Sequence, residues 1–333
     1  MPELRQNLAT KEWVIIATER ARRPEEFVEP THARTDERPD WLADCPFCPG
    51  NEELDLEVLR IPQEGAWQLR VVCNKYPALQ REGERTFSFD GIHRMISGVG
   101  HHEVLIETPR HNSAPALQRS DEVALMLRAF QLRGQEVTTD PRVQHLIYFK
   151  NHGVRAGTSL LHPHTQLIGL PVVPHTIRLR TEEARRYFDD HGMCVFCKMI
   201  EDELSDGVRI VMESEHFVAF VPFAAFSPFH LWILPRRHHS NFLDTQANEI
   251  ADLGHLLRQV LRKFYVGLND PDYNYVIRSA PIHDPAMEYL HWYLALVPRV
   301  SRAAGFELGS GMFINIALPE ASAAFLREVK EDN

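Results

Sequence analysis

The sequence has no excess of positive charge. Its 36 lysine and arginine residues are outnumbered by 46 aspartate and glutamate residues, which gives a formal net charge of −10 and a pI near 6.0. Nucleic acids and anionic membrane surfaces demand a basic binding surface, so this balance argues against both as partners. An anionic small molecule would have to be bound by local arginines instead.

The sequence also lacks two segments that would direct it to a membrane. The N-terminal stretch "MPELRQNLATKEW" does not have the basic and then apolar pattern of a signal peptide, so we expect a cytoplasmic protein. The apolar run at residues 217–235 approaches the roughly 20 residues that a spanning helix needs. Because Pro222, Pro228 and Pro235 interrupt this run, it predicts buried strands and no membrane partner.

Cysteine is scarce, with five residues in 333, and four of the five form two C-x-x-C pairs. These are Cys45 with Cys48 in "CPFC" and Cys194 with Cys197 in "CVFC". In a reducing compartment such pairs indicate metal sites or redox dithiols rather than structural disulfides. Histidine-rich stretches follow both pairs and favour metal.

The two C-x-x-C pairs open two similar stretches of chain, which indicates an internal repeat. Each pair is followed by a strand-like run ending in histidine, a helical stretch, a second strand-like run and a further histidine. The first helix is predicted from Ser120, a plausible N-cap. The second has an apolar stripe at three- and four-residue steps, formed by Ile250, Leu253, Leu256, Leu257, Val260, Leu261 and Phe264.

Matching histidines complete a possible ligand set in each copy. His111 and His162 are 51 residues apart, and His238 and His291 are 53 apart. Two thiolates and two imidazoles suit tetrahedral Zn²⁺. We therefore predict one zinc site from Cys45, Cys48, His111 and His162, and a second from Cys194, Cys197, His238 and His291. The alternative is that the thiols are free and the histidines are ordinary core or surface residues; a zinc ribbon for DNA conflicts with the acidic balance.

The first copy carries chemistry that the second does not. Alignment of the copies sets His164 against Tyr293 and Gln166 against Ala295, so "HPHTQ" keeps a histidine and a glutamine used only once. Residues two apart in a strand face the same way, and a metal-held His162 would fix His164 as a nucleophile. The preceding "NHGVRAGTSLLH" supplies open backbone N–H groups and hydroxyls, including Gly157 and Ser159, that can surround phosphate oxygens.

The chain resembles the galactose-1-phosphate uridylyltransferase family of the histidine-triad superfamily, especially the branch that includes plant ADP-glucose phosphorylases. The resemblance covers nearly the whole chain, through "ELRQNLATKEWVIIATERARRP", "CPFC", "NKYPAL", "ETPRH", "NHGVRAGTSLLHPHTQ", "PFHLWILPRRH", "HWYLALVPR" and "GFELGSGMFIN". It implies an α/β fold of the α+β type: two fused histidine-triad-like halves, residues 1–190 and 191–333, with one antiparallel sheet and helices outside.

The resemblance also implies an activity and its residues. His164 would attack the α-phosphorus of a nucleotide sugar, release a sugar 1-phosphate and then pass the nucleotidyl group to a second phosphate acceptor. Gln166 stands where hydrolytic relatives carry a third histidine, which favours transfer. The nucleotide and its phosphates would contact Arg20, Arg23, Asn74, Asn151, Gly157, Ser159 and Gln166. Phe306 and Glu307 would contact the sugar from the neighbouring subunit of a homodimer.

Two departures leave the substrate open. The second-metal H-x-H pair of some bacterial relatives is replaced by Ala295 and Val297, and the lysine that precedes "GYE" in bacterial uridylyltransferases has no match before Gly305. We rank UDP-glucose:galactose-1-phosphate uridylyltransferase first. An ADP-glucose phosphorylase, an adenylyltransferase or a dinucleoside-polyphosphate phosphorylase is second, and a non-enzymatic zinc-containing nucleotide-binding protein is a distant third.

Overall fold

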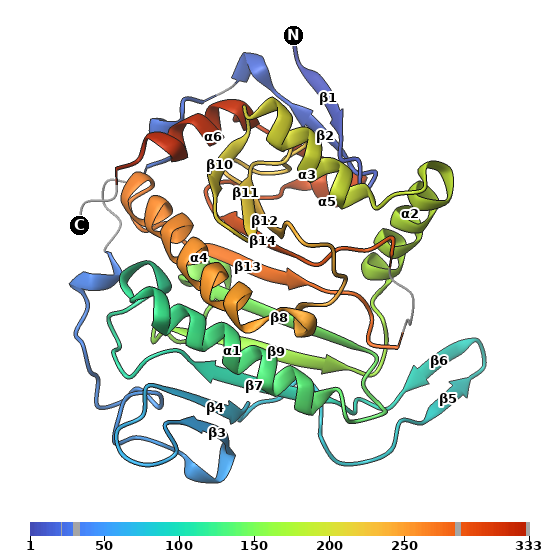
Figure 1. The fold of residues 1–333 in the computed structure, drawn as a ribbon. Helices are drawn as coiled ribbons and strands as arrows, with labels where there is room; N and C mark the ends of the chain where they lie inside the picture. The colour runs from blue at the N-terminus through green and yellow to red at the C-terminus, as the bar shows by residue number, and fades with distance from the viewer. Residues whose placement is uncertain (21, 29–33, 284–287, 331–333) are drawn as a thin grey trace.

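The computed structural model describes residues 1–20, 22–28, 34–283 and 288–330 (Figure 1). Ten of the described strands form one sheet in which every neighbouring pair is antiparallel. Their order is β10 (Ile210–Glu213), β11 (Phe217–Phe220), β12 (Leu231–Pro235), β14 (Tyr293–Pro298), β13 (Tyr273–Arg278), β8 (His145–His152), β9 (His164–Leu170), β7 (His101–Ile106), β4 (Leu69–Cys73) and β3 (Glu57–Ile61).

The repeat is visible in this order. From its centre, where β8 pairs with β13, the sheet runs outward as β9, β7, β4, β3 on one side and as β14, β12, β11, β10 on the other. The run at residues 217–235 forms the two buried strands β11 and β12, as its prolines predict. The predicted fold, two fused halves sharing one antiparallel sheet, is confirmed.

Two long helices, α1 (Ser120–Val137) and α4 (Ala247–Gly267), lie side by side across one face of this sheet (Figure 1). All seven predicted stripe residues of α4 are buried, at 3% exposure or less. The helices pack so closely that a Cβ on Gly254 would lie 2.7 Å from the backbone of Ala124. This face holds the largest apolar core.

The predicted N-cap of α1 is wrong by one residue. The helix begins at Ser120 and its N-cap is Arg119, whose backbone N–H donates to the carboxylate of Glu122 at 2.7 Å. Because Glu122 satisfies this end of the helix, the Ser120 hydroxyl is free to lie 3.3 Å from Nδ1 of His255.

The opposite face of the sheet differs between the halves. Over the second half, α2 (His175–His191) and α3 (Val195–Asp206) cover it and form a second core with β11, β12 and β14. Over the first half, the described residues of this face form a small apolar cluster around Trp67, Val72, Val104 and Ile106. The rest of this face of the first half is not covered by a helix and can therefore form a binding site.

The other described elements lie around this framework. β1 (Glu3–Gln6), β2 (Trp13–Ile16) and β15 (Phe313–Asn315) form a small sheet, and β5 (Phe87–Asp90) with β6 (His93–Ile96) forms a hairpin. The short helices α5 (Gly305–Ser310) and α6 (Pro319–Glu328) lie on either side of β15 in the sequence. Among the described helices, none combines the length and apolar composition required to cross a membrane.

Candidate active site

The first predicted ligand set comes together in the structure. Cys45, Cys48, His111 and His162 are all buried, and one ligand atom from each lies within 4.8 Å of the others. Cys48 Sγ is 3.6 Å from Nδ1 of both His111 and His162. Nε2 of His162 lies 2.8 Å from the carbonyl oxygen of Thr108, to which it donates, so Nδ1 is left to face the thiols. These four residues could hold a metal ion.

The second predicted set also comes together, in the equivalent place of the second half. Cys194, Cys197, His238 and His291 have ligand atoms within 4.8 Å of one another, with His238 on the surface. Cys197 Sγ lies 3.2 Å from Nδ1 of His238 and 3.6 Å from Nδ1 of His291. Nε2 of His291 donates to the carbonyl of Pro235 at 2.8 Å, as His162 does to Thr108. This set could hold a metal ion as well.

The imidazole of His164 is oriented for nucleophilic attack. His164 opens β9, two residues after His162, and its Nδ1 lies 2.8 Å from the His162 carbonyl oxygen. A proton on Nδ1 donates to that carbonyl, so Nε2 keeps its lone pair. Burial lowers the pKa of His164 to about 4, and the ring is neutral near pH 7. On the helix side of the sheet, buried Lys150 donates from Nζ to the His164 carbonyl at 3.2 Å.

Gln166 is held by a histidine that the sequence interpretation missed. The backbone N–H of Ala78 donates to Nδ1 of His102 at 3.0 Å, which leaves the proton of a neutral His102 on Nε2. Nε2 lies 2.8 Å from Oε1 of Gln166 and donates to it. The Gln166 amide therefore keeps its N–H groups for another acceptor. Asn74 Nδ2 is 3.1 Å from the same Nε2.

His164 and Gln166 line a cavity of about 520 Å³ on the uncovered face of the first half. Its wall is apolar where Phe47, Leu56, Val72, Val104 and Ile106 meet, and it is charged where Glu53, Arg70 and Lys75 lie. The ring of Phe47 packs edge-on against those of His162 and His164, with centroids 6.0 and 5.5 Å apart. This volume and mixed lining suit a small organic ligand that carries phosphate.

The structure brings some of the other predicted contact residues to this cavity. Asn74 and Ser159 line it. Asn151 lies in β8 and is not part of the cavity lining; its Oδ1 accepts from Nδ2 of Asn274 at 2.8 Å. Gly157 adopts a φ of 90°, which only glycine takes readily, and a Cβ at this position would lie 3.9 Å from Nδ2 of Asn151.

Three of the predicted contact residues, Arg23, Phe306 and Glu307, lie elsewhere, and a fourth, Arg20, has no described side chain. Arg23 is exposed and does not line the cavity, and the side chain of Arg20 is outside the part of the chain that the structure describes. Phe306 and Glu307 lie in α5, where Phe306 is 44% exposed and the Glu307 carboxylate accepts from the backbone N–H of Ala304. Within one chain, none of the described members of this group reaches His164.

Residues that the sequence interpretation missed are Phe47, Lys75, Tyr76 and His102. His102, Val104 and Ile106 alternate along β7 on the cavity side, so the period-two pattern of a strand could have identified His102. Tyr76, 82% exposed, stands at the mouth of the cavity without a pattern that marks it.

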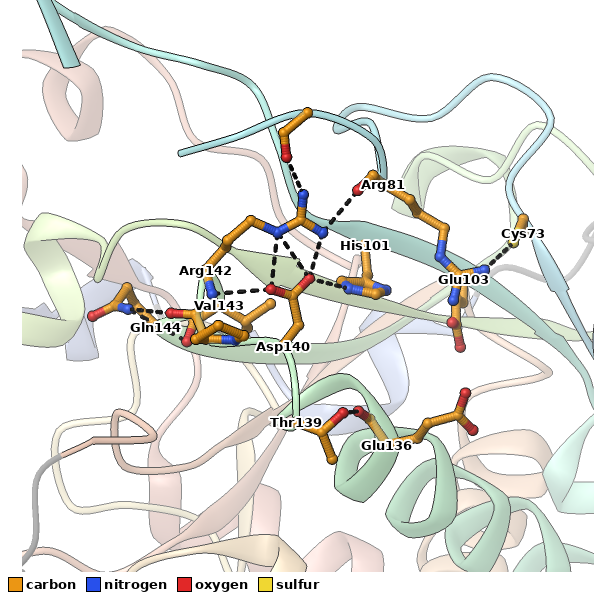
Figure 2. A network of polar contacts seen from close by, with 12 residues as sticks. Cys73, Arg81, His101, Glu103, Glu136, Thr139, Asp140, Arg142, Val143 and Gln144 are labelled. Carbon is orange, nitrogen blue, oxygen red and sulfur yellow. Dashed lines mark hydrogen bonds and ion pairs between the residues drawn. The ribbon is translucent and has the colours of Figure 1, made fainter. Parts of the chain in front are cut away.

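A polar network on the face of β7 away from the cavity holds the segment around Arg81 and Gly83, which follows β4 (Figure 2). Asp140 accepts from His101 Nε2 at 2.9 Å and from the guanidinium of Arg142. Arg142 also donates to the carbonyls of Arg81, at 2.8 Å, and of Gly83. Hydrogen bonding to Arg142 and His101 holds the pKa of Asp140 well below its usual range. The segment that follows the cavity-lining residues 74–76 is thus tied to the end of α1.

Comparison with known proteins gives concordant matches over both halves. The model of the galactose-1-phosphate uridyl transferase N-terminal domain matches residues 1–174, and that of the C-terminal domain matches residues 180–301. ADP-glucose phosphorylase of Arabidopsis thaliana is 38% identical, over 98% of this chain and 93% of its own. Galactose-1-phosphate uridylyltransferase of Thermotoga maritima is 29% identical, over 99% of both chains.

A solved structure agrees with these matches. The crystal structure of an Arabidopsis thaliana ADP-glucose phosphorylase with bound ADP-glucose has a TM-score of 0.84 and 34% identity, and the match covers the whole of both chains. The family models and the relatives match nearly the full length of the chain. The chain therefore belongs to the galactose-1-phosphate uridylyltransferase family.

Proposed function

We propose that this protein is a nucleotidyltransferase that moves a nucleoside monophosphate from a nucleotide sugar to a second phosphate acceptor by way of His164. The observation that carries the proposal is the orientation of that imidazole. Its Nδ1 is anchored on the His162 carbonyl at 2.8 Å, and the ring borders a cavity of about 520 Å³. A neutral imidazole with a fixed ring and a free lone pair is a competent nucleophile at neutral pH.

The reaction has two displacements at phosphorus. In the first, Nε2 of His164 forms a bond to the α-phosphorus, and the bond from that phosphorus to the bridging oxygen breaks. The sugar 1-phosphate leaves with the electron pair. In the second, a phosphate oxygen of the acceptor bonds to the same phosphorus and the P–N bond breaks, which returns the electron pair to Nε2. Such a scheme gives ping-pong kinetics.

Gln166 would stabilise the transferring group in both steps. Because His102 occupies Oε1 at 2.8 Å, the amide N–H groups are available to the phosphoryl oxygens, on which negative charge is concentrated. An amide cannot act as a general base for water at neutral pH. This favours transfer to an acceptor over hydrolysis.

We propose zinc for both Cys/His sets, because two thiolates and two imidazoles are the donors that tetrahedral Zn²⁺ prefers. The residues of the first set fit, since all four are buried and His162 and His111 direct Nδ1 at the Cys48 thiol. Zinc would supply structural anchorage there. What this chain contributes to the reaction is the His162 carbonyl, which orients the ring of His164.

The comparisons support two candidates for the nucleotide sugar that gives up its nucleotidyl group. Uridylyl transfer to galactose 1-phosphate, with UDP-glucose as the donor we propose, is the first candidate, because the domain models that match residues 1–174 and 180–301 are those of galactose-1-phosphate uridyl transferase. Phosphorolysis of ADP-glucose is the second, and the 38% identity to an ADP-glucose phosphorylase favours it.

We also propose a homodimer, in which Phe306 and Glu307 of one subunit complete the sugar site of the other. Their location in α5, away from the cavity of their own chain, and the 44% exposure of Phe306 support this arrangement. Arg20 and Arg23 would approach the phosphates in the same complex. The boundary between the two halves is proposed near residue 190, at the end of α2.

Intact-mass spectrometry after separate incubation with UDP-glucose and with ADP-glucose tests the activity. One donor should add the mass of a single uridylyl or adenylyl group, and that donor is the substrate. His164→Asn should abolish labelling, whereas His93→Asn, at an exposed histidine of β6, should label normally. A nucleotide-binding protein without activity would acquire neither mass, and full turnover of His164→Asn would refute the role of His164.

A further inference from the structure

The second half contains a small cavity at the position equivalent to the His164 cavity. Its volume is about 80 Å³, and its walls come from β12, β13, β14, α2 and the N-terminal segment around Glu12. In the register of the sheet, Tyr293 opens β14 as His164 opens β9, and Arg278 lies directly opposite Tyr293. The phenol of Tyr293 replaces the imidazole of His164 there, so the cavity lacks the group proposed for nucleotidyl transfer and is suited to binding.

Two buried hydrogen-bond donors of this cavity have no partner among the described residues. Nε of Arg278 is one of them. The other is His230, which is 3% exposed. Its Nε2 accepts from Nε1–H of Trp232 at 3.0 Å, so the proton of the neutral ring is on Nδ1, and this Nδ1 has no acceptor. A buried donor without an acceptor destabilises a fold unless a ligand satisfies it.

Positive charge in the cavity is only partly balanced. Arg180 lines it beside Arg278, and Glu12 is the single acidic residue among its described lining. The Glu12 carboxylate is 57% exposed and lies 3.7 Å from Arg180, so it compensates that arginine weakly. Burial and the neighbouring charge of Arg180 lower the pKa of Arg278, which is the direction expected for a cation without a counter-ion.

We propose that this cavity binds a free tetrahedral oxyanion of the inorganic phosphate class, held by Arg278, Arg180 and the Nδ1–H of His230. The argument is independent of the activity proposed for His164. A metal cation is disfavoured, because two guanidinium groups and a proton-bearing imidazole nitrogen offer it no lone pair. A sugar phosphate is too large for about 80 Å³. Arginine forks match the geometry of phosphate oxygens.

The proposal predicts opposite effects of Arg278→Met with and without phosphate. Without phosphate, the variant should melt at the same temperature as wild type or higher, because an unpaired buried charge is removed. Inorganic phosphate, added at constant ionic strength, should raise the melting temperature of wild type by several degrees through binding to the folded state. In Arg278→Met, phosphate should raise the melting temperature much less. Calorimetry should show that the variant binds phosphate about 10-fold to 100-fold more weakly than wild type.

Arg186→Met is the matched control, since it removes an exposed arginine of the same helix as Arg180. It should respond to phosphate as wild type does. Crystals grown with tungstate should show anomalous density between Arg278 and Arg180. A lower melting temperature of Arg278→Met without phosphate, an unchanged response to phosphate, or an Arg278-dependent response to glucose 1-phosphate would overturn the proposal. Nucleotidyl labelling by His164 is measured separately and does not depend on this result.

Discussion

Breaking the buried ion pair behind the nucleophile should strongly destabilise the fold. Lys150 in β8 and Glu107, just after β7, are 1% and 2% exposed, and Nζ lies 2.6 Å from Oε1. Lys150 also donates to the carbonyl of His164, while Oε2 of Glu107 has no partner among the described residues. Lys150→Met would leave the carboxylate buried and unpaired. We expect a loss of about 3–5 kcal/mol in the free energy of unfolding.

The same reasoning predicts recovery in a double variant. Lys150→Met with Glu107→Met removes both charges and keeps the volume, so it should regain most of the loss and lie within about 1–2 kcal/mol of wild type. Urea unfolding followed by circular dichroism would give the midpoints. Lys198→Met, at a partly exposed lysine of α3 that pairs with Glu201, is the control and should cost less than about 1 kcal/mol. A single variant as stable as this control, or a double variant no better than Lys150→Met, would refute the reasoning.

Three further outcomes follow from the site and its surroundings. His102→Leu should free the Gln166 amide to rotate and lower kcat by about 10-fold, with nucleotide affinity nearly unchanged; an effect on KM alone would contradict the positioning role. Cys45→Ser should reduce bound metal by about one equivalent and lower the melting temperature, as measured by atomic absorption and calorimetry. Arg237 lowers the pKa of Glu249 from 4.5 to about 2, so this pair stabilises the fold above pH 4.5 and its contribution is lost as pH falls toward 2. Glu249→Gln should therefore cost about 1–2 kcal/mol at pH 7 and less at pH 3, and equal losses at both pH values would argue against the pair.

Much of the candidate site could be predicted from the sequence, because several of its residues lie close together along the chain. The ligand spacing of Cys45 with Cys48, and the proximity of His162 to His164, are set within a few residues, and the repeat supplied His111. His102 was missed because its importance comes from Gln166, a neighbour across the strand pair β7–β9 and 64 residues away in sequence. The pairing of Lys150 with Glu107 spans 43 residues and likewise depends on the sheet.

The second cavity is the clearest case of a feature that only the tertiary structure decided. Arg180 on α2, His230 before β12 and Arg278 at the end of β13 share no sequence pattern, and each would pass as an ordinary polar residue by itself.

The sequence alone determined the repeat, the helix stripe of α4, the two Cys/His sets and the histidine next to them, because periodicity and short-range spacing are written along the chain. Tertiary structure decided which donors are buried without acceptors, which charges lack a counter-ion and which face of the sheet stays uncovered. Those properties depend on the solvent exposure and distances of residues far apart in the chain, which exist only once the strands have paired and the helices have packed.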